Sequence, residues 1–256
     1  MKIEKLFDEA LRNMDATLHA LERRVPPPKR IPFRDGFVYR YEEMTIHQAL
    51  IQKLARVITG LRAARILLEH GFVQEQAALH RILDELQEDA VFLAWGVITN
   101  DITDLHRQYL SAFYEEEFDQ PESPLKSTQK RPMVARKKIQ ASIARMEAAA
   151  VDQSTGVELL RTLHKAYSGF VHGASPAIMD MYGGVPPHFH VQGMLGTTRI
   201  AEHRYDLWNY FYRGIVAFGL AVKAFGEDAV LESIRKFLDE FEKESGESYV
   251  LSQRKT

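Results

Sequence analysis

Five polar side chains in the third quarter of the sequence are spaced so that they could act together on a charged substrate. If residues 155–172 form a helix, one narrow stripe of it carries an acid, two cations, a hydroxyl and an imidazole: Glu158, Arg161, Lys165, Ser168 and His172. A histidine at a helix C-terminus is stabilised in its cationic form by the helix dipole. Beside a cation that holds a phosphate, such an imidazole can carry out acid–base chemistry on a phosphodiester.

The stripe therefore predicts His172, Lys165, Ser168 and Arg161 as catalytic residues. The opposite side of the same helix is apolar, which is the side expected to face the core. The alternative interpretation is that the stripe is an ordinary solvated face, as most charged helix faces are.

A second pair of candidate residues lies on a helix expected over residues 74–98. Arg81 and Glu85 are four residues apart, the spacing of a common intrahelical ion pair worth a few tenths of a kcal/mol. The alternative is that both are buried beside His172 and orient it. We predict them as binding residues on the second interpretation.

The segments LHRILDE (79–85) and YSGFVHG (167–173) together resemble a family of bacterial all-helical proteins. That family has an Arg-x-x-x-Glu helix followed by a Ser-x-x-x-His-Gly motif in the same order. It is similar, more distantly, to the HEPN superfamily of all-α nucleotide-binding and ribonuclease domains. The resemblance covers about residues 44–240, and each motif is short.

The resemblance implies a HEPN-like protein that acts on RNA or nucleotides in stress or defence, as a metal-independent ribonuclease or as a binder, without a cofactor. HEPN ribonucleases carry an arginine followed, after four to six residues, by a histidine. His172 matches that histidine, whereas Lys165, followed by Ala166, stands where the arginine is expected. A lysine is a point charge and lacks the planar, bidentate guanidinium.

HEPN-like domains commonly pair through their motif helices, so the resemblance also implies a homodimer. The expected helix 199–224 is rich in aromatic residues, which suggests more apolar surface than one bundle needs. The competing hypothesis is a non-enzymatic module that binds a protein or a small ligand through its helices.

A basic stretch between residues 126 and 138 contains no acidic residue. It is expected to be a solvated linker, or, if it is ordered beside the stripe, to follow a phosphate backbone. The residues predicted to bind in that case are Lys130, Arg131, Arg136, Lys137 and Lys138.

Two further histidines allow a third hypothesis, a His-ligated metal protein. His188 and His190 follow two prolines in an extended segment, so their side chains point the same way. A His-x-His pair alone is a weak metal signal, and no helical His-Glu-x-x-His motif accompanies it. We therefore predict no metal.

Periodic apolar residues predict the elements that would position these side chains. We expect an all-α, HEPN-like bundle of about seven or eight helices whose core is formed by residues 44–69, 74–98, 155–172 and 199–224. Residues 1–43 are expected to form an N-terminal helix and a connector, and residues 44–246 the bundle domain. A mobile loop is expected at about 118–133 and a long loop at about 173–197.

On a helical wheel of the helix expected over 74–98, the first half has one apolar face, formed by Leu79, Ile82, Leu83, Leu86 and Ala90. Asp84 and Glu88 lie opposite, with Arg81 and Glu85. The second half is apolar all round, so it is expected to cross the centre of the fold.

Composition limits the classes of function. The chain has 256 residues, a net charge of −2 and no cysteine, which excludes disulfides, thiolate nucleophiles and cysteine zinc sites. There is no glycine-rich phosphate loop and no nucleophile elbow, which argues against an NTPase, a dinucleotide enzyme or an α/β-hydrolase. The charged N-terminus is unlike a signal peptide. We expect a cytoplasmic protein with no membrane segment.

Overall fold

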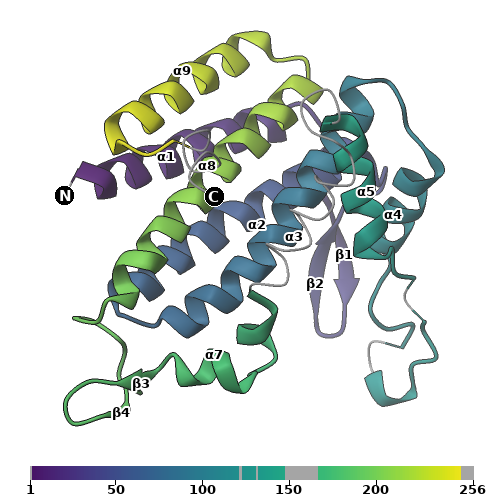
Figure 1. Ribbon diagram of the computed structural model, residues 1–256. Coiled ribbons are helices and arrows are strands. Elements are labelled where there is room, and N and C mark those ends of the chain that lie inside the picture. Colours follow the sequence, from purple (N-terminus) through teal and green to yellow (C-terminus); the bar gives the residue numbers. More distant parts are fainter. Residues whose placement is uncertain (1, 121–122, 131, 148–166, 249–256) are drawn as a thin grey trace.

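The protein is helical almost throughout. Its computed structural model describes residues 2–120, 123–130, 132–147 and 167–248 (Figure 1). The described helices are α1 (Lys2–Glu22), α2 (Ile46–Glu69), α3 (Val73–Ile98), α4 (Asp104–Tyr114), a 3-10 turn η1 (Pro124–Lys126), α5 (Arg136–Glu147), α7 (Ser175–Met179), α8 (Arg199–Ala224) and α9 (Asp228–Ser245). The prediction of an all-α bundle is confirmed. Of the helix expected over 155–172, residues 167–171 are described and helical.

Helices α2, α3 and α8 form the centre of the bundle, with α1 and α9 on one side and α4 and α5 on another (Figure 1). The Thr45 hydroxyl accepts from the Gln48 backbone N–H, and the Gln48 side chain accepts from the Thr45 N–H, so a capping box begins α2. Helix α2 ends before Gly71, whose positive φ of 78° suits glycine and allows a tight turn into α3.

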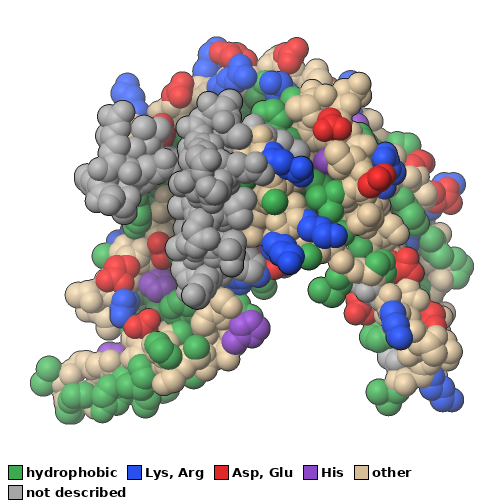
Figure 2. All heavy atoms as spheres, turned by 45° about the vertical axis from the view of Figure 1, so that its right-hand side comes forward, with side chains coloured by type: hydrophobic (Ala, Val, Ile, Leu, Met, Phe, Trp, Pro, Cys, Tyr) green, Lys and Arg blue, Asp and Glu red, His purple; other side chains and the backbone are tan. Residues whose placement is uncertain are grey.

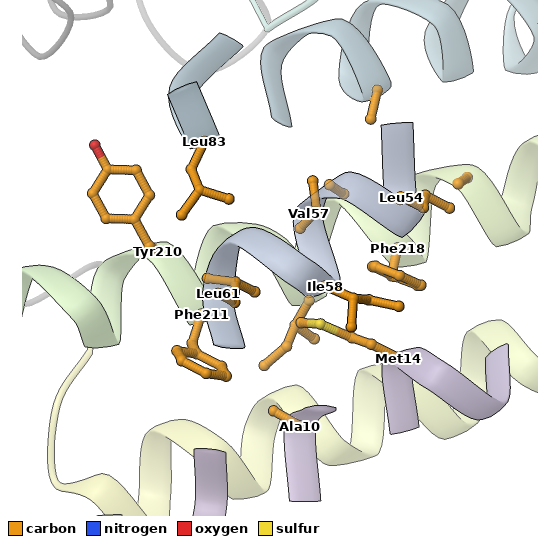
Figure 3. Close-up of a cluster of buried hydrophobic side chains, with 14 of the residues drawn as sticks. Ala10, Met14, Leu54, Val57, Ile58, Leu61, Leu83, Tyr210, Phe211 and Phe218 are labelled. Carbon is orange, nitrogen blue, oxygen red and sulfur yellow. The ribbon is translucent and has the colours of Figure 1, made fainter. Parts of the chain in front are cut away.

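The main core lies where α1, α2 and α8 meet. Phe7 of α1 stacks on Phe211 of α8 with ring centroids 4.3 Å apart. Figure 3 shows Met14 of α1 beside Phe218 of α8, with α2 side chains between the two helices. Residues from the predicted N-terminal segment 1–43 therefore share a core with the bundle.

The prediction for the first half of α3 is wrong in one respect. Ile82, expected on the buried face, is largely exposed, whereas Asp84 and Glu88 are buried. The reason is that α8 and α5 present Arg213 and Arg136 to these carboxylates. A buried charge is tolerated when an opposite charge and hydrogen bonds compensate its lost hydration.

Two short hairpins interrupt the helices. Strand β1 (Lys29–Phe33) pairs antiparallel with β2 (Gly36–Arg40), in the segment expected to be a connector. Strand β3 (Tyr182–Gly183) pairs with β4 (His188–Phe189) within the long loop expected at 173–197. That loop also contains α7, so it is more structured than its composition suggests.

The loop expected at 118–133 is organised around one carboxylate in its described residues. Asp119 accepts hydrogen bonds from the hydroxyls of Ser127 and Thr128, at 2.6 and 2.8 Å. The mobility of this loop stays a prediction.

Two glycines inside helices provide a matched test of this packing. A Cβ added at Gly96 of α3 would lie 2.5 Å from Nε2 of His106, whose ring stacks on Phe92. A Cβ added at Gly219 of α8 would be 3.5 Å from its nearest neighbour, Ile234. We expect Gly96→Ala to lower the free energy of unfolding by about 1–3 kcal/mol because the core is overpacked.

The control, Gly219→Ala, should leave stability unchanged or raise it by up to about 1 kcal/mol, since alanine is the better helix former. Urea unfolding of both variants measures the difference. Equal effects of the two substitutions would contradict the close approach of α3 to His106.

Candidate functional site

A row of buried polar side chains runs along α3, on the side that faces α8 and α5. We call it the polar seam, and it consists of His80, Asp84, Gln87, Glu88 and Asp89. His80, Asp84 and the pair Gln87–Glu88 recur at the i, i+4 and i+7/i+8 spacing that keeps side chains on one helix face. Among the described residues, the seam is the largest group of polar side chains inside the bundle.

Asp84 is the centre of the α3–α8 contact. Its Oδ1 accepts a hydrogen bond from the Tyr210 hydroxyl at 3.0 Å and forms an ion pair with Nη1 of Arg213 at 2.6 Å. Burial by itself would lower the pKa of Arg213, but the adjacent Asp84 carboxylate raises that pKa above its ordinary value. Arg213 is therefore charged, and its contact with Asp84 holds the two helices together.

His80 lies one turn before Asp84 and is fully buried. Its ring stacks on Tyr210, with centroids 4.0 Å apart, and meets the ring of Tyr167 edge-on at 5.5 Å. Among the described residues, neither ring nitrogen has a hydrogen-bond partner, and the same is true of Oδ2 of Asp84 and Oε1 of Gln87. Burial lowers the pKa of His80 well below its usual value, so the ring is neutral near pH 7.

Tyr167 brings the segment 167–172 against the polar seam. Besides its contact with His80, its hydroxyl is hydrogen-bonded to Asp206 of α8. Burial raises the pKa of both Tyr167 and Asp206. The two sequence segments that carry the family resemblance therefore meet through Tyr167 and His80.

The predicted catalytic residues are only partly described. Ser168 is half-buried, and His172 is exposed just beyond the helical residues, with its backbone N–H donating to the Ser168 carbonyl at 3.1 Å. Arg161 and Lys165 lie outside the described residues. The exposed position of His172 leaves its imidazole open to a ligand from solvent.

Arg81 and Glu85 form the intrahelical ion pair that their spacing suggested, with Nη2 and Oε1 2.6 Å apart. The Arg81 side chain is 15% exposed and the Glu85 side chain 46% exposed, so the pair lies at the edge of the bundle. The Glu85 side chain is therefore the more solvent-exposed partner.

Arg136 binds the polar seam and joins α5 to α3. Its guanidinium contacts Oε2 of Glu88 at 2.9 Å, Oδ1 of Asp89 at 2.5 Å and the backbone carbonyl of Glu85 at 2.8 Å. Burial alone would lower the pKa of Arg136, but the carboxylates of Asp89 and Glu88 raise it. Its charge is thus engaged inside the protein, where it fixes the position of α5.

Asp89 connects two more elements to the seam. Its Oδ2 accepts from Nζ of Lys53 in α2 at 2.7 Å and from the hydroxyl of Tyr109 in α4 at 2.6 Å. Burial, with the adjacent carboxylate, raises the pKa of Tyr109. One carboxylate on α3 thereby positions α2, α4 and α5.

The remaining basic residues of this stretch are at the surface. Lys130, Lys137 and Lys138 are exposed, and Arg131 lies outside the described residues. Lys138 lines an open hollow of about 440 Å³ between α4 and α5, together with Leu105, Gln108, Ala141 and Arg145. Among the described residues, the lining contains two cations and an amide but no carboxylate. Helices α4 and α5, at the right of Figure 1, are turned forward in Figure 2, where Lys and Arg side chains gather near the middle of the face.

Comparison with protein-family models, with curated proteins and with solved structures finds no match to this chain. The resemblance stated above therefore remains an expectation, and the side chains carry the functional argument. Among the helices of the described residues, none has the length and apolarity needed to span a bilayer.

His188 and His190 lie close together, with ring centroids 4.5 Å apart. Nδ1 of His188 donates to the Pro186 carbonyl at 2.9 Å, which leaves Nε2 as the free nitrogen. In the described part of the chain, no group of three or more metal-ligating side chains is found. The prediction of no metal stays a prediction.

Sequence reasoning missed the α8 half of the site. Asp206, Tyr210 and Arg213 occur at i, i+4 and i+7, the same helical spacing as the seam on α3. This regular row of polar residues inside an aromatic-rich segment was the available signal.

We predict that His80 makes the protein sensitive to acid. Because the unfolded histidine has a pKa of about 6.5 and the folded one a lower pKa, its contribution is fully present above about pH 6.5 and is lost as the pH falls below it. In His80→Phe the aromatic ring stays and no hydrogen bond is lost. Between pH 7.5 and pH 5.5, the difference in free energy of unfolding between this variant and the wild type should shift by about 1.4 kcal/mol in favour of the variant.

Urea unfolding at the two pH values measures this difference. His188→Phe, at an exposed histidine, is the control and should follow the wild type. An identical pH dependence in His80→Phe and wild type would show that His80 is already protonated or solvated in the native state.

Proposed function

We propose that this chain is a HEPN-like protein that binds RNA or a nucleotide, and that the hollow between α4 and α5 receives the phosphates. The supporting observation is the lining of that hollow, in which Lys138 and Arg145 are accompanied by Gln108 and, among the described residues, by no carboxylate. A protein with a net charge of −2 has no general attraction for nucleic acid, so a local group of cations is the feature that binding requires.

The position of the hollow favours a stable site. Helix α5 is fixed to α3 by the ion pairs of Arg136 with Glu88 and Asp89. Lys138 and Arg145, seven residues apart on that helix, thus share a face and are held near one another. Cations on a fixed helix lose less conformational freedom on binding than cations on a free linker.

The stripe of Arg161, Lys165, Ser168 and His172 is the proposed place for chemistry on the bound RNA. Its support is the order of the two motifs and the exposed imidazole of His172 at the end of the helical residues 167–171. In this proposal His172 moves a proton at the scissile phosphodiester and Lys165 holds the phosphate. Tyr167, packed on His80, positions the stripe.

We expect the variant Lys138→Ala/Arg145→Ala to bind single-stranded RNA about tenfold more weakly near 0.1 M salt, with a salt dependence lowered by roughly 1.4, because two phosphate contacts are removed. Fluorescence anisotropy of a labelled RNA measures both quantities. The matched control is Lys236→Ala/Arg235→Ala on α9, where one side chain of each type is exposed away from the hollow. Equal losses in both variants would contradict the assignment of the hollow.

For cleavage, we expect His172→Ala to abolish RNA hydrolysis while RNA binding is retained. Lys165→Ala should reduce the rate, and Lys165→Arg should maintain or increase it, since a guanidinium can bind a phosphate through two hydrogen bonds. The measurement is RNA cleavage in the presence of a chelator, with melting temperatures recorded in parallel. Binding without cleavage by the wild type would leave a binder and exclude the ribonuclease.

If the wild type neither binds nor cleaves RNA and binds no nucleotide, the proposed function fails. The non-enzymatic module that binds a protein then becomes the leading interpretation.

A further inference from the structure

A hollow lies between the β1–β2 hairpin and the C-terminal end of α4, and we call it the hairpin hollow. Its volume is about 720 Å³, within the range of about 300–1,000 Å³ that small-molecule sites usually have. Its walls come from the hairpin, from the segment 41–44, from α2 and from residues 113–116, where α4 ends. Figure 1 shows the hairpin and α4 on the same side of the bundle.

Hydrogen bonds between these walls hold the hairpin hollow in shape. Arg40 of β2 donates twice to Glu116, from Nε to Oε1 at 2.5 Å and from Nη2 to Oε2 at 3.0 Å. The Tyr114 hydroxyl of α4 donates to the backbone carbonyl of Thr45, at the start of α2, at 2.8 Å. The hairpin and α2 are thereby joined to the end of α4, so the hollow exists in the folded protein before any ligand binds.

The hollow has aromatic walls. Four of its lining residues carry aromatic rings: Tyr39, Tyr41, Phe113 and Tyr114. Rings in this region already contact cations of the chain, since Nζ of Lys53 lies 4.8 Å from the ring centroid of Phe113. On the hairpin, the guanidinium of Arg30 lies 3.6 Å from the ring centroid of Phe37, which meets Tyr39 edge-on at 5.4 Å. Aromatic faces attract cations through the negative charge of their π-systems.

Carboxylates outnumber cations in the lining of the hollow. Among its described residues are three carboxylates and one guanidinium: Glu42, Glu115, Glu116 and Arg40. The charge of Arg40 is balanced by Glu116, whose pKa is lowered by this contact. Glu42 contacts Nζ of Lys29 at 2.6 Å, in a pair exposed to solvent. These two pairs leave the third carboxylate to set the charge of the hollow.

Glu115 is that third carboxylate. It accepts a hydrogen bond from the Gln129 side-chain amide, and in the part of the chain that the structure describes no cation pairs with it. The hairpin hollow is therefore negative, whereas the hollow with Lys138 and Arg145, which adjoins the first half of α4, is positive. The two hollows beside one helix select ligands of opposite charge.

This combination of rings and carboxylates favours one class of ligand. A phosphate would be repelled by the carboxylates. A metal ion would need a group of three or more ligating side chains, and none is found among the described residues. A wholly apolar ligand would remove ionised carboxylates from water without compensation. A cation with apolar substituents satisfies both the rings and Glu115.

We propose that the hairpin hollow binds a small organic cation of the alkylammonium class. The ring of Tyr39, which is 58% exposed, contacts the alkylated ammonium group, and the carboxylate of Glu115 supplies the opposite charge. The site is separate from the proposed RNA site, because it shares no residue with the Lys138 hollow or with the stripe that ends at His172.

The test is a titration of the full chain, labelled with ¹³C at its methionine methyl groups, followed by NMR. Choline is the probe, added up to about 20 mM, which detects dissociation constants in the millimolar range. Met44 lines the hollow and is 49% exposed, so its methyl signal should shift on binding. Met179, which is 47% exposed on α7, is the internal control and should not shift.

The charge of the ligand is tested with 3,3-dimethylbutan-1-ol, which has the shape of choline but no charge. We expect it to bind at least about fivefold more weakly than choline, because it gains neither the ring nor the carboxylate interaction. Inorganic phosphate should not shift the Met44 signal.

Two variants test the assigned residues. Tyr39→Leu and Glu115→Gln should each raise the dissociation constant of choline about fivefold. Their matched controls are Tyr182→Leu and Glu240→Gln, at an exposed tyrosine and an exposed glutamate elsewhere, which should bind choline like the wild type. Melting temperatures should be unchanged in all four, because the side chains are exposed.

The chain's own cations must also be tested as occupants. Arg131 lies two positions after Gln129 in the sequence and outside the described residues. We expect Arg131→Ala to bind choline like the wild type. Tighter binding in this variant would show that the chain itself competes for the hollow and would overturn the proposal.

The proposal is also overturned if choline leaves the Met44 signal unchanged, or if the uncharged alcohol binds as tightly as choline. A Met44 shift with phosphate and not with choline would assign the hollow to anions instead. None of these outcomes alters the result expected for Lys138→Ala/Arg145→Ala with RNA, so the two proposals fail separately.

Discussion

The burial of acidic side chains on α3 is the constraint on which the arrangement of the helices depends. Asp84, Glu88 and Asp89 lie on the central helix and are removed from water, so each needs a cation within contact distance. Arg213 of α8, Arg136 of α5 and Lys53 of α2 meet this need. Breaking one of these pairs leaves an uncompensated buried charge, which typically costs about 3–5 kcal/mol.

This constraint also connects the fold to the proposed site. The guanidinium of Arg136 is paired with the carboxylates of the seam, and this contact fixes α5. Lys138 and Arg145 of the same helix remain at the surface. Tyr167 packs against His80 of the same seam, and this contact places the helical residues 167–171 on the bundle. The surface cations and the segment that ends at His172 are therefore both positioned by buried polar groups.

The unsatisfied atoms of the seam show that this arrangement has a cost. Both nitrogens of His80, one oxygen of Asp84 and the amide oxygen of Gln87 have no hydrogen-bond partner in the part of the chain that the structure describes. Each buried polar group without a hydrogen bond typically costs about 1–3 kcal/mol. An apolar core of the same shape would avoid that cost, which is consistent with a polar seam retained for the specificity of helix packing rather than for stability.

Local rules, which act within a few residues, were sufficient to predict much of the framework. The capping box at Thr45 and Gln48 and the apolar period of α2 depend on neighbours three or four positions apart, so they could be predicted from the sequence. The ion pair of Arg81 with Glu85 is local in the same sense. The β1–β2 hairpin was expected only as a connector, because its strands are mostly exposed and lack a buried face.

Only the tertiary structure decided which charges are buried. Aspartate is a residue type usually found at the surface. The burial of Asp84 depends on Arg213, which is 129 positions away in the chain. Arg136 could not be separated from Lys137 and Lys138 by sequence, because their difference lies in contacts with α3. The sequence by itself determined the positions of the helices and the absence of charged residues over residues 181–198. The fold decided that this uncharged segment is exposed, since that depends on the close approach of Gly193 to the α2–α3 turn.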